Sequence, residues 1–186
     1  MDTNLKKLKH VDIVYPNDKV SIKEKVGEPT EFDFSIGSVV TNFAYLEDIV
    51  KMMIRFLLKI DPVSADIVTS ELSFKNLVNM FGALIEHKLK GCSDKNIIEE
   101  IDEIIYLIEL SEQFRNKIVH SSYVYNQHRI KKTAKRSGGL KISSESISAD
   151  YIFDIGDFIA EITEPVLSVP IILKLADSHS NDGNNY

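Results

Sequence analysis

Three polar residues near the end of the longest helix-patterned stretch carry the side chains that phosphodiester chemistry requires. Arg115, Asn116 and His120 lie within the segment RNKIVHSSY. Arginine stays protonated and presents a planar fork of donors to phosphate, while an unperturbed histidine titrates near neutrality and can take or give a proton. The spacing therefore predicts a fixed cation beside a general acid or base, which is the pair that phosphodiester cleavage uses.

The helix predicted over 94–120 determines where these side chains lie. With each residue advancing about 100°, the apolar residues fall on one broad, core-facing side. They are Ile97, Ile101, Ile104, Ile105, Ile108, Phe114 and Ile118. Asn116 and His120 are four residues apart and stack on a polar edge. Arg115 projects among the apolar positions, where a charge needs a partner or must face a second surface.

Two interpretations of this motif follow from the residues alone. Arg115 could make a buried ion pair with a carboxylate while a solvated His120 interacts favourably with the helix C-terminus. Alternatively, the motif is an active site. Glu47, on the first long helix predicted by the sequence, could hold Arg115 or the imidazole, or could form an ordinary structural salt bridge.

The motif resembles that of the HEPN domain family (higher eukaryotes and prokaryotes nucleotide-binding). Many HEPN members are metal-independent endoribonucleases with an R-x4-6-H motif at the end of a long helix, and Arg115, Asn116 and His120 match it position by position. The resemblance covers residues 35 to 177, although only the motif is specific. A toxin subfamily has a tyrosine two residues after the histidine, and this sequence departs from it with Ser122.

The resemblance implies a function and partners. HEPN nucleases typically form homodimers in which two motif helices meet around one scissile phosphate of RNA, without a metal or other cofactor. His120 would then act on the ribose 2′-hydroxyl, Arg115 would stabilise the phosphorane, and Asn116 would position phosphate or His120. Such proteins act as toxins or in antiphage and stress defence, so an antitoxin or other regulatory protein is an expected partner.

Positive charge is concentrated directly after the motif. Residues 126 to 144 hold six basic side chains and no acidic one: Arg129, Lys131, Lys132, Lys135, Arg136 and Lys141. Taking these six from the 22 basic residues leaves 16 basic against 28 acidic residues in the rest of the chain. The segment therefore has a net charge of +6 and the rest of the chain a net charge of −12. Such a segment can bind nucleic-acid phosphate through counterion release. We name its part from Arg129 to Lys141 the basic ribbon and expect it to bind RNA, although a solvated hairpin would have the same composition.

The elements that position the motif are predicted from periodicity and capping residues. A first long helix has Ser35 as candidate N-cap and stops before Asp61-Pro62. A short helix over 64–70 and a longer one from Ser73 to Gly91 precede the motif helix, which Ser93 or Asp94 caps.

The remaining elements follow the motif helix. Strand-forming residues on both sides of Ser137-Gly138-Gly139 predict a basic β-hairpin over about 123–147. A final helix over 149–166 is expected to end or kink at Pro165 and Pro170. The predicted fold class is all-α, an antiparallel helical bundle of four to five helices with an inserted basic β-hairpin. Its domain spans 34–177, after an extended arm over 1–33 and before a disordered tail over 178–186.

Composition restricts the class of protein. At 186 residues, with 44% hydrophobic and 27% charged residues, the chain suits one domain with a sizeable core. A single Cys92 excludes an internal disulfide framework and suits a reducing compartment, so we expect a cytoplasmic protein that does not enter membranes. Gly-rich phosphate loops and Cys/His zinc patterns are absent from the sequence.

Two other function classes remain open. A non-catalytic HEPN-like module could bind RNA or a nucleotide with the same residues, because a fold does not determine a function. A structural or regulatory helical dimer is the third class. Enzyme and binder differ in whether His120→Ala abolishes cleavage but spares RNA affinity, and a structural dimer would bind no RNA.

Overall fold

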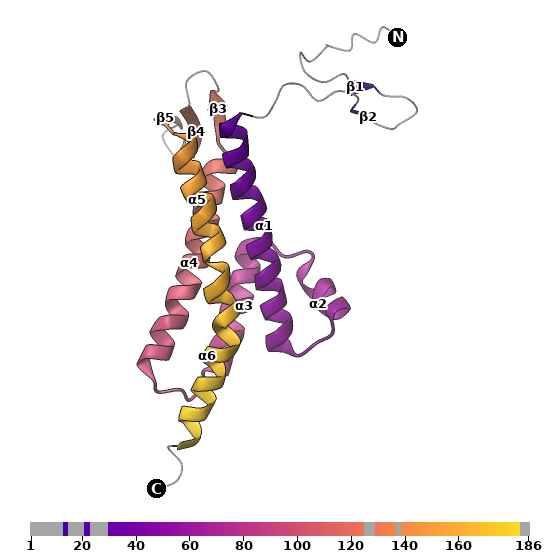
Figure 1. Cartoon of the computed structure of the whole chain (residues 1–186), viewed down its shortest axis with the longest axis vertical. Coiled ribbons are helices and arrows are strands. Elements are labelled where there is room, and N and C mark those ends of the chain that lie inside the picture. Colours follow the sequence, from indigo (N-terminus) through magenta and orange to yellow (C-terminus); the bar gives the residue numbers. More distant parts are fainter. Residues whose placement is uncertain (1–12, 15–20, 23–29, 125–128, 137–138, 183–186) are drawn as a thin grey trace.

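The computed structural model describes residues 13–14, 21–22, 30–124, 129–136 and 139–182 of the chain. Six helices dominate it, and Figure 1 shows the long ones side by side with a small sheet at one end of the bundle. The predicted all-α class is confirmed. One helix, the motif helix, runs in the opposite direction to the first and to the last two (Figure 1).

The first helix, α1 (Glu31–Leu58), begins earlier than its apolar periodicity predicts. Thr30 is its N-cap, and a capping box joins the Thr30 side chain to the Asp33 amide (3.2 Å) and the Asp33 carboxylate to the Thr30 amide (2.9 Å). The prediction that Ser35 is the N-cap is wrong. Its buried hydroxyl donates to the carbonyl of Phe32 (2.8 Å) inside the helix. The helix therefore extends into the segment predicted to be an arm.

The next two helices, α2 (Pro62–Thr69) and α3 (Phe74–Lys88), agree closely with expectation. Asp61 caps α2 by accepting from the amide of Ser64 (3.1 Å). Ser73, predicted as the first residue of α3, is its N-cap. After α3 ends, Gly91 adopts a φ of 93°, a conformation that glycine reaches without steric cost.

The motif helix, α4 (Lys95–Val119), is capped by Asp94, which decides between the two predicted N-caps. The apolar side expected from the helical wheel faces the core. Ile97, Ile101, Ile104, Ile108 and Ile118 are buried, and Ile105 and Phe114 pack against the same cluster.

Two consecutive helices, α5 (Ala149–Glu161) and α6 (Thr163–Asp182), replace the single final helix that was predicted. The boundary falls at Ile162 rather than at a proline. Pro165 lies in the first turn of α6, where backbone amides have no partner within the helix, and α6 continues through Pro170. Helix also extends to Asp182, past the predicted domain end at 177, and 183–186 lie outside the described residues.

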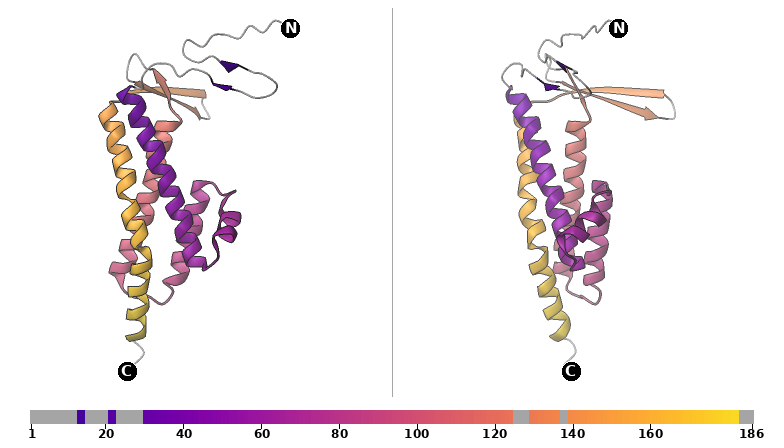
Figure 2. Two further views of the ribbon diagram at one scale, coloured as in Figure 1. Left: turned by 45° about the vertical axis from the view of Figure 1, so that its right-hand side comes forward. Right: turned by 90° about the vertical axis from the view of Figure 1, so that its right-hand side faces the viewer.

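The sheet contains β3 (Ser122–Val124), β4 (Arg129–Arg136) and β5 (Gly139–Ser146), paired antiparallel in that order. Strands β4 and β5 pair from Arg129 opposite Ser146 to Arg136 opposite Gly139, which confirms the predicted hairpin and adds β3 to it. Figure 2 shows the two strands projecting sideways from the end of the bundle at which α4 ends and α5 begins.

The predicted N-terminal arm is described only in part. Within it, β1 (Ile13–Val14) pairs antiparallel with β2 (Ser21–Ile22).

The core forms where α1 packs against α3, α4, α5 and α6. The contact between α1 and α5 is close. The side-chain Nδ2 of Asn42 donates to the backbone carbonyl of Gly156 (2.9 Å), and a Cβ added at Gly156 would lie 2.6 Å from Ser38 Oγ. These helices and α4 meet at the end of the bundle that carries the motif.

Candidate functional site

The last two turns of α4 and its C-cap hold the three predicted motif residues. Buried Ile118 fixes this end of the helix to the core. Arg115 and Asn116 are half-buried, while His120 is exposed at the C-cap and its amide donates to the carbonyl of Asn116 (3.2 Å). Because the C-cap residue leaves the regular helix, the His120 side chain can approach Arg115 despite their separation on an ideal helical wheel.

The structure brings the three side chains into contact through one nitrogen of Arg115. Its Nη1 donates to Asn116 Oδ1 (3.0 Å) and lies 3.4 Å from His120 Nε2. A guanidinium can only donate, so this second contact requires an unprotonated Nε2 and a ring proton on Nδ1. At 3.4 Å the contact is longer than an ordinary hydrogen bond of about 2.9 Å, and an incoming substrate group could replace it.

An aromatic ring from another helix lies under the arginine. The Arg115 guanidinium carbon is 5.2 Å from the centroid of the Phe43 ring on α1, within the range of a cation–π interaction. Phe43 is buried and contacts Phe74 of α3, with ring centroids 4.5 Å apart. In the sequence, Phe43 is one of the apolar residues that recur with helical spacing along the first helix, a pattern that gives no signal of its partner.

Glu47 lies on α1 one turn after Phe43, and it does not have the catalytic contact considered for it. Its carboxylate forms a salt bridge with Lys51 Nζ (2.7 Å), the ordinary structural alternative. Within the described part of the chain, no acidic side chain forms an ion pair with Arg115. The buried arginine–carboxylate pair that the sequence left open is therefore not found there.

A neighbouring cluster, which the sequence did not indicate, joins the motif helix to the hairpin. Lys117 Nζ lies 3.0 Å from Glu145 Oε1 on β5 and 5.3 Å from the centroid of the Tyr151 ring on α5. Burial acts to lower the pKa of Lys117, but the hydrogen bond and charge of Glu145, with Tyr151, outweigh it and raise that pKa above its ordinary 10.5. Lys117 thus stays charged and connects three elements beside the motif.

The basic ribbon lies on two paired strands. Its five predicted RNA-binding residues belong to β4, and Lys141 belongs to β5. They are Arg129, Lys131, Lys132, Lys135 and Arg136. Because β3 begins two residues after His120 and pairs with β4, the ribbon is connected directly to the motif end of α4.

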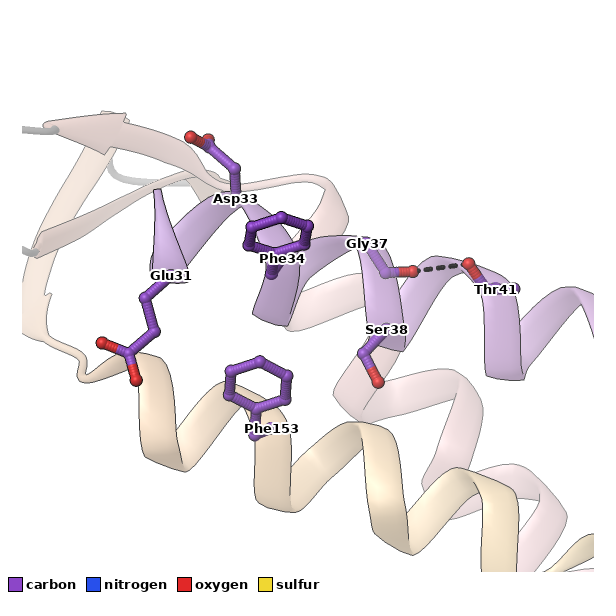
Figure 3. Close-up of a pocket in the computed structure, with 7 residues that line it drawn as sticks. All are labelled: Glu31, Asp33, Phe34, Gly37, Ser38, Thr41 and Phe153. Carbon is purple, nitrogen blue, oxygen red and sulfur yellow. Dashed lines mark hydrogen bonds between the residues drawn. The ribbon is translucent and has the colours of Figure 1, made fainter. Parts of the chain in front are cut away.

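The hollow drawn in Figure 3 lies between the first turns of α1 and α5 and has a volume of about 820 Å³. Figure 3 shows the Phe34 and Phe153 rings on opposite sides of it and Glu31 at its outer end, while the Asp33 carboxylate points away from it. The Thr41 hydroxyl at its other end already donates to the carbonyl of Gly37 (2.7 Å). None of the three motif residues lines this hollow.

No family model, curated protein or solved structure matches this chain. Among the described residues, no helix has both the length and the apolar character needed to cross a bilayer. In the same part of the chain, histidine, cysteine, aspartate and glutamate side chains nowhere gather in threes as they would to hold a metal ion.

Proposed function

We propose that this protein is a metal-independent endoribonuclease of the HEPN type that acts as a homodimer through Arg115, Asn116 and His120. One observation carries the proposal. Arg115 Nη1 lies between Asn116 Oδ1 (3.0 Å) and His120 Nε2 (3.4 Å) at a solvent-accessible helix end, without an acidic partner in the described residues. The site therefore combines an unneutralised cation with a titratable ring.

The chemistry is a transesterification within RNA. His120 takes the proton of a ribose 2′-hydroxyl, and the 2′-oxygen attacks the adjacent phosphorus. Arg115 stabilises the negative charge that develops on the phosphorane oxygens, and Asn116 holds Arg115 or the phosphate in place. The bond to the 5′-oxygen breaks, which leaves a 2′,3′-cyclic phosphate on one product and a 5′-hydroxyl on the other.

A dimer supplies the second proton transfer. The departing 5′-oxygen needs a proton, and one protomer contributes a single motif histidine. Two motif helices meeting about a two-fold axis would place a second His120 on the opposite side of the phosphate, where it can act as the general acid. In this proposal each chain carries half of an active site.

Purified protein incubated with total cellular RNA in EDTA tests the proposal. We expect cleavage that survives chelation, with 2′,3′-cyclic phosphate ends, and no cleavage of DNA, which lacks the 2′-hydroxyl. The His120→Ala variant, purified identically, controls for contaminating nucleases. Cleavage that requires added Mg²⁺ or Mn²⁺, or that acts on DNA, would contradict the mechanism.

The basic ribbon supports a second candidate, a non-catalytic RNA-binding module. Six positive charges without an acidic residue can hold RNA whether or not the motif cleaves it. RNA binding by the wild type, without cleavage and unchanged in His120→Ala, would favour this candidate over the nuclease.

A further inference from the structure

The environment of Arg115 differs from that of an arginine serving only stability. A guanidinium that is partly withdrawn from water, as the half-buried Arg115 is, is usually matched by a carboxylate, because desolvating an unpaired charge is costly. Here its charge lies over the face of Phe43, with 5.2 Å between the guanidinium carbon and the ring centroid. An aromatic face attracts the cation without cancelling its charge, so Arg115 is held in place and remains available to an anion.

The donors of Arg115 are divided between two edges. A guanidinium has five N–H groups, and the two on Nη1 are directed to Asn116 Oδ1 (3.0 Å) and His120 Nε2 (3.4 Å). The Nη2 and Nε groups have no hydrogen-bond partner among the described residues. That pair of groups forms the edge that binds two oxygens of one phosphate in bidentate recognition.

Phe43 is itself fixed in position. It is 4% exposed, and its ring packs against Phe74 at a centroid distance of 4.5 Å and an interplanar angle of 50°. The nearest carboxylate along its helix face, Glu47 one turn later, is bound by Lys51. The ring therefore offers a rigid surface to the guanidinium, and the carboxylate one turn along the same helix is paired with a lysine.

From these contacts we propose that Phe43 is the positioning residue for Arg115, holding the guanidinium so that its Nη2–Nε edge binds a phosphate. This inference deepens the proposed function and rests on it for its role in cleavage. The phosphate recognised is the scissile diester, with inorganic phosphate as the simplest ligand for the same edge. Phe43 touches neither substrate nor reacting atoms and acts only through Arg115.

Nuclear magnetic resonance of the arginine side chains tests the geometry directly. In the wild type, the ring current of Phe43 should shift the Arg115 side-chain protons upfield, and added inorganic phosphate should move the Arg115 Nε–H resonance. Phe43→Leu should abolish the upfield shift and weaken phosphate binding on the order of 2- to 30-fold, the range expected for removing one cation–π interaction.

Phe81→Leu is the matched control, because Phe81 is a fully buried core ring, whereas the ring found over the Arg115 guanidinium in the described part of the chain is Phe43. This variant should keep the upfield shift, and its phosphate affinity should stay within about 2-fold of the wild-type value. If Phe43→Leu does not fold, Phe43→Met gives a second ringless variant with a more adaptable side chain. The wild-type upfield shift tests the contact without any variant.

The outcomes separate this inference from the proposed function. An Arg115 resonance without an upfield shift, or without a response to phosphate, overturns the inference, as does equal phosphate affinity in Phe43→Leu and Phe81→Leu. If phosphate binding behaves as expected but the wild type does not cleave RNA, the nuclease proposal fails and the role of Phe43 in positioning Arg115 stands. If RNA is cleaved, Phe43→Leu should lower kcat more than Phe81→Leu does.

Discussion

At the scale of single residues, the motif needs both the positive charge of Arg115 and the planar arrangement of its N–H donors. Arg115 Nη1 donates to Asn116 Oδ1 and lies 3.4 Å from His120 Nε2. Its planar Nη2–Nε edge is left for two oxygens of one phosphate, whereas a lysine ammonium is a point charge without such a fork. Glu47, the acidic residue considered as a partner of Arg115, forms its ion pair with Lys51 instead. The two residues should therefore differ sharply when each is replaced conservatively.

We expect Arg115→Lys to lower RNA cleavage by about 10²- to 10³-fold, the cost of losing a donor that stabilises the transition state. Glu47→Gln, its control, should retain cleavage within about 3-fold and lose at most about 0.5 kcal/mol of stability from its helical ion pair. Initial rates on one defined RNA measure both. A loss of cleavage in Glu47→Gln as large as in Arg115→Lys would mean that Glu47 has the catalytic role considered for it in the sequence analysis.

At the scale of elements, the packing of the bundle depends on how closely α1 and α5 approach. Gly156 makes this possible, because a Cβ there would lie 2.6 Å from Ser38 Oγ and 3.2 Å from Ser38 Cβ. Gly37, also helical, has open space where its Cβ would be. The same substitution at the two glycines should therefore have opposite effects.

Gly156→Ala should destabilise the protein by about 1–3 kcal/mol, the usual cost of overpacking. Gly37→Ala should stabilise it by about 0.5–1 kcal/mol through helix propensity. Thermal unfolding measures both, with Tm changing by about 2–4 °C per kcal/mol in a domain of this size. Equal effects of the two variants would mean that the helices are not in close contact at Gly156.

The second prediction at this scale concerns the connection from α4 to the hairpin. A double-mutant cycle of Lys117→Met and Glu145→Gln should give a coupling free energy of about 0.5–1 kcal/mol at neutral pH. Because the pKa of Lys117 is raised in the folded state, the pair contributes its full stability below the ordinary value of 10.5. That contribution should disappear as the pH rises through the higher folded-state pKa.

Denaturant unfolding of the four proteins at neutral pH and above pH 10.5 measures this coupling. A coupling free energy that is zero at neutral pH, or that grows with pH, would contradict the assignment of Lys117 as a charged partner of Glu145.

At the scale of the whole molecule, the proposed function requires two copies of the chain. The Arg115 and His120 side chains lie at an accessible helix end, and one chain supplies one His120 for two proton transfers. We therefore expect a homodimer at micromolar concentration whose interface includes the C-terminal end of α4. Light scattering measures the mass, and a strictly monomeric protein would count strongly against a shared site.

The division of charge between ribbon and body leads to the second whole-molecule prediction. Neutralising Lys131, Lys132, Lys135 and Arg136 together should weaken RNA binding and flatten its salt dependence. The slope should fall by up to about 0.7 for each phosphate of a single strand that the variant no longer neutralises. Turnover at saturating RNA should fall much less, because Arg115 remains. If the variant keeps the wild-type RNA affinity and salt slope, the basic ribbon is a solvated hairpin that does not bind RNA.

The sequence by itself determined the features that depend on neighbours along the chain. The buried face of α4 followed from its isoleucine spacing, the start of α3 near Ser73 from periodicity, and the pairing of β4 with β5 from strand-forming residues on both sides of a predicted turn. Two local predictions were wrong because another local signal was stronger. The capping box of Thr30 and Asp33 starts α1 before its apolar periodicity begins. Pro165 does not end a helix, because it lies in the first turn of α6, where proline is tolerated.

Only the tertiary structure decided which partners the motif has. Phe43 and Arg115 belong to different helices, and apolar periodicity says that a ring is buried without saying what lies on its face. Likewise, Lys117 meets Glu145 across 28 residues of chain, and Glu47 pairs with Lys51 rather than Arg115 because Lys51 is one turn away on its own helix. Local spacing fixes helices and their faces, whereas contacts between helices depend on how all of them pack at once.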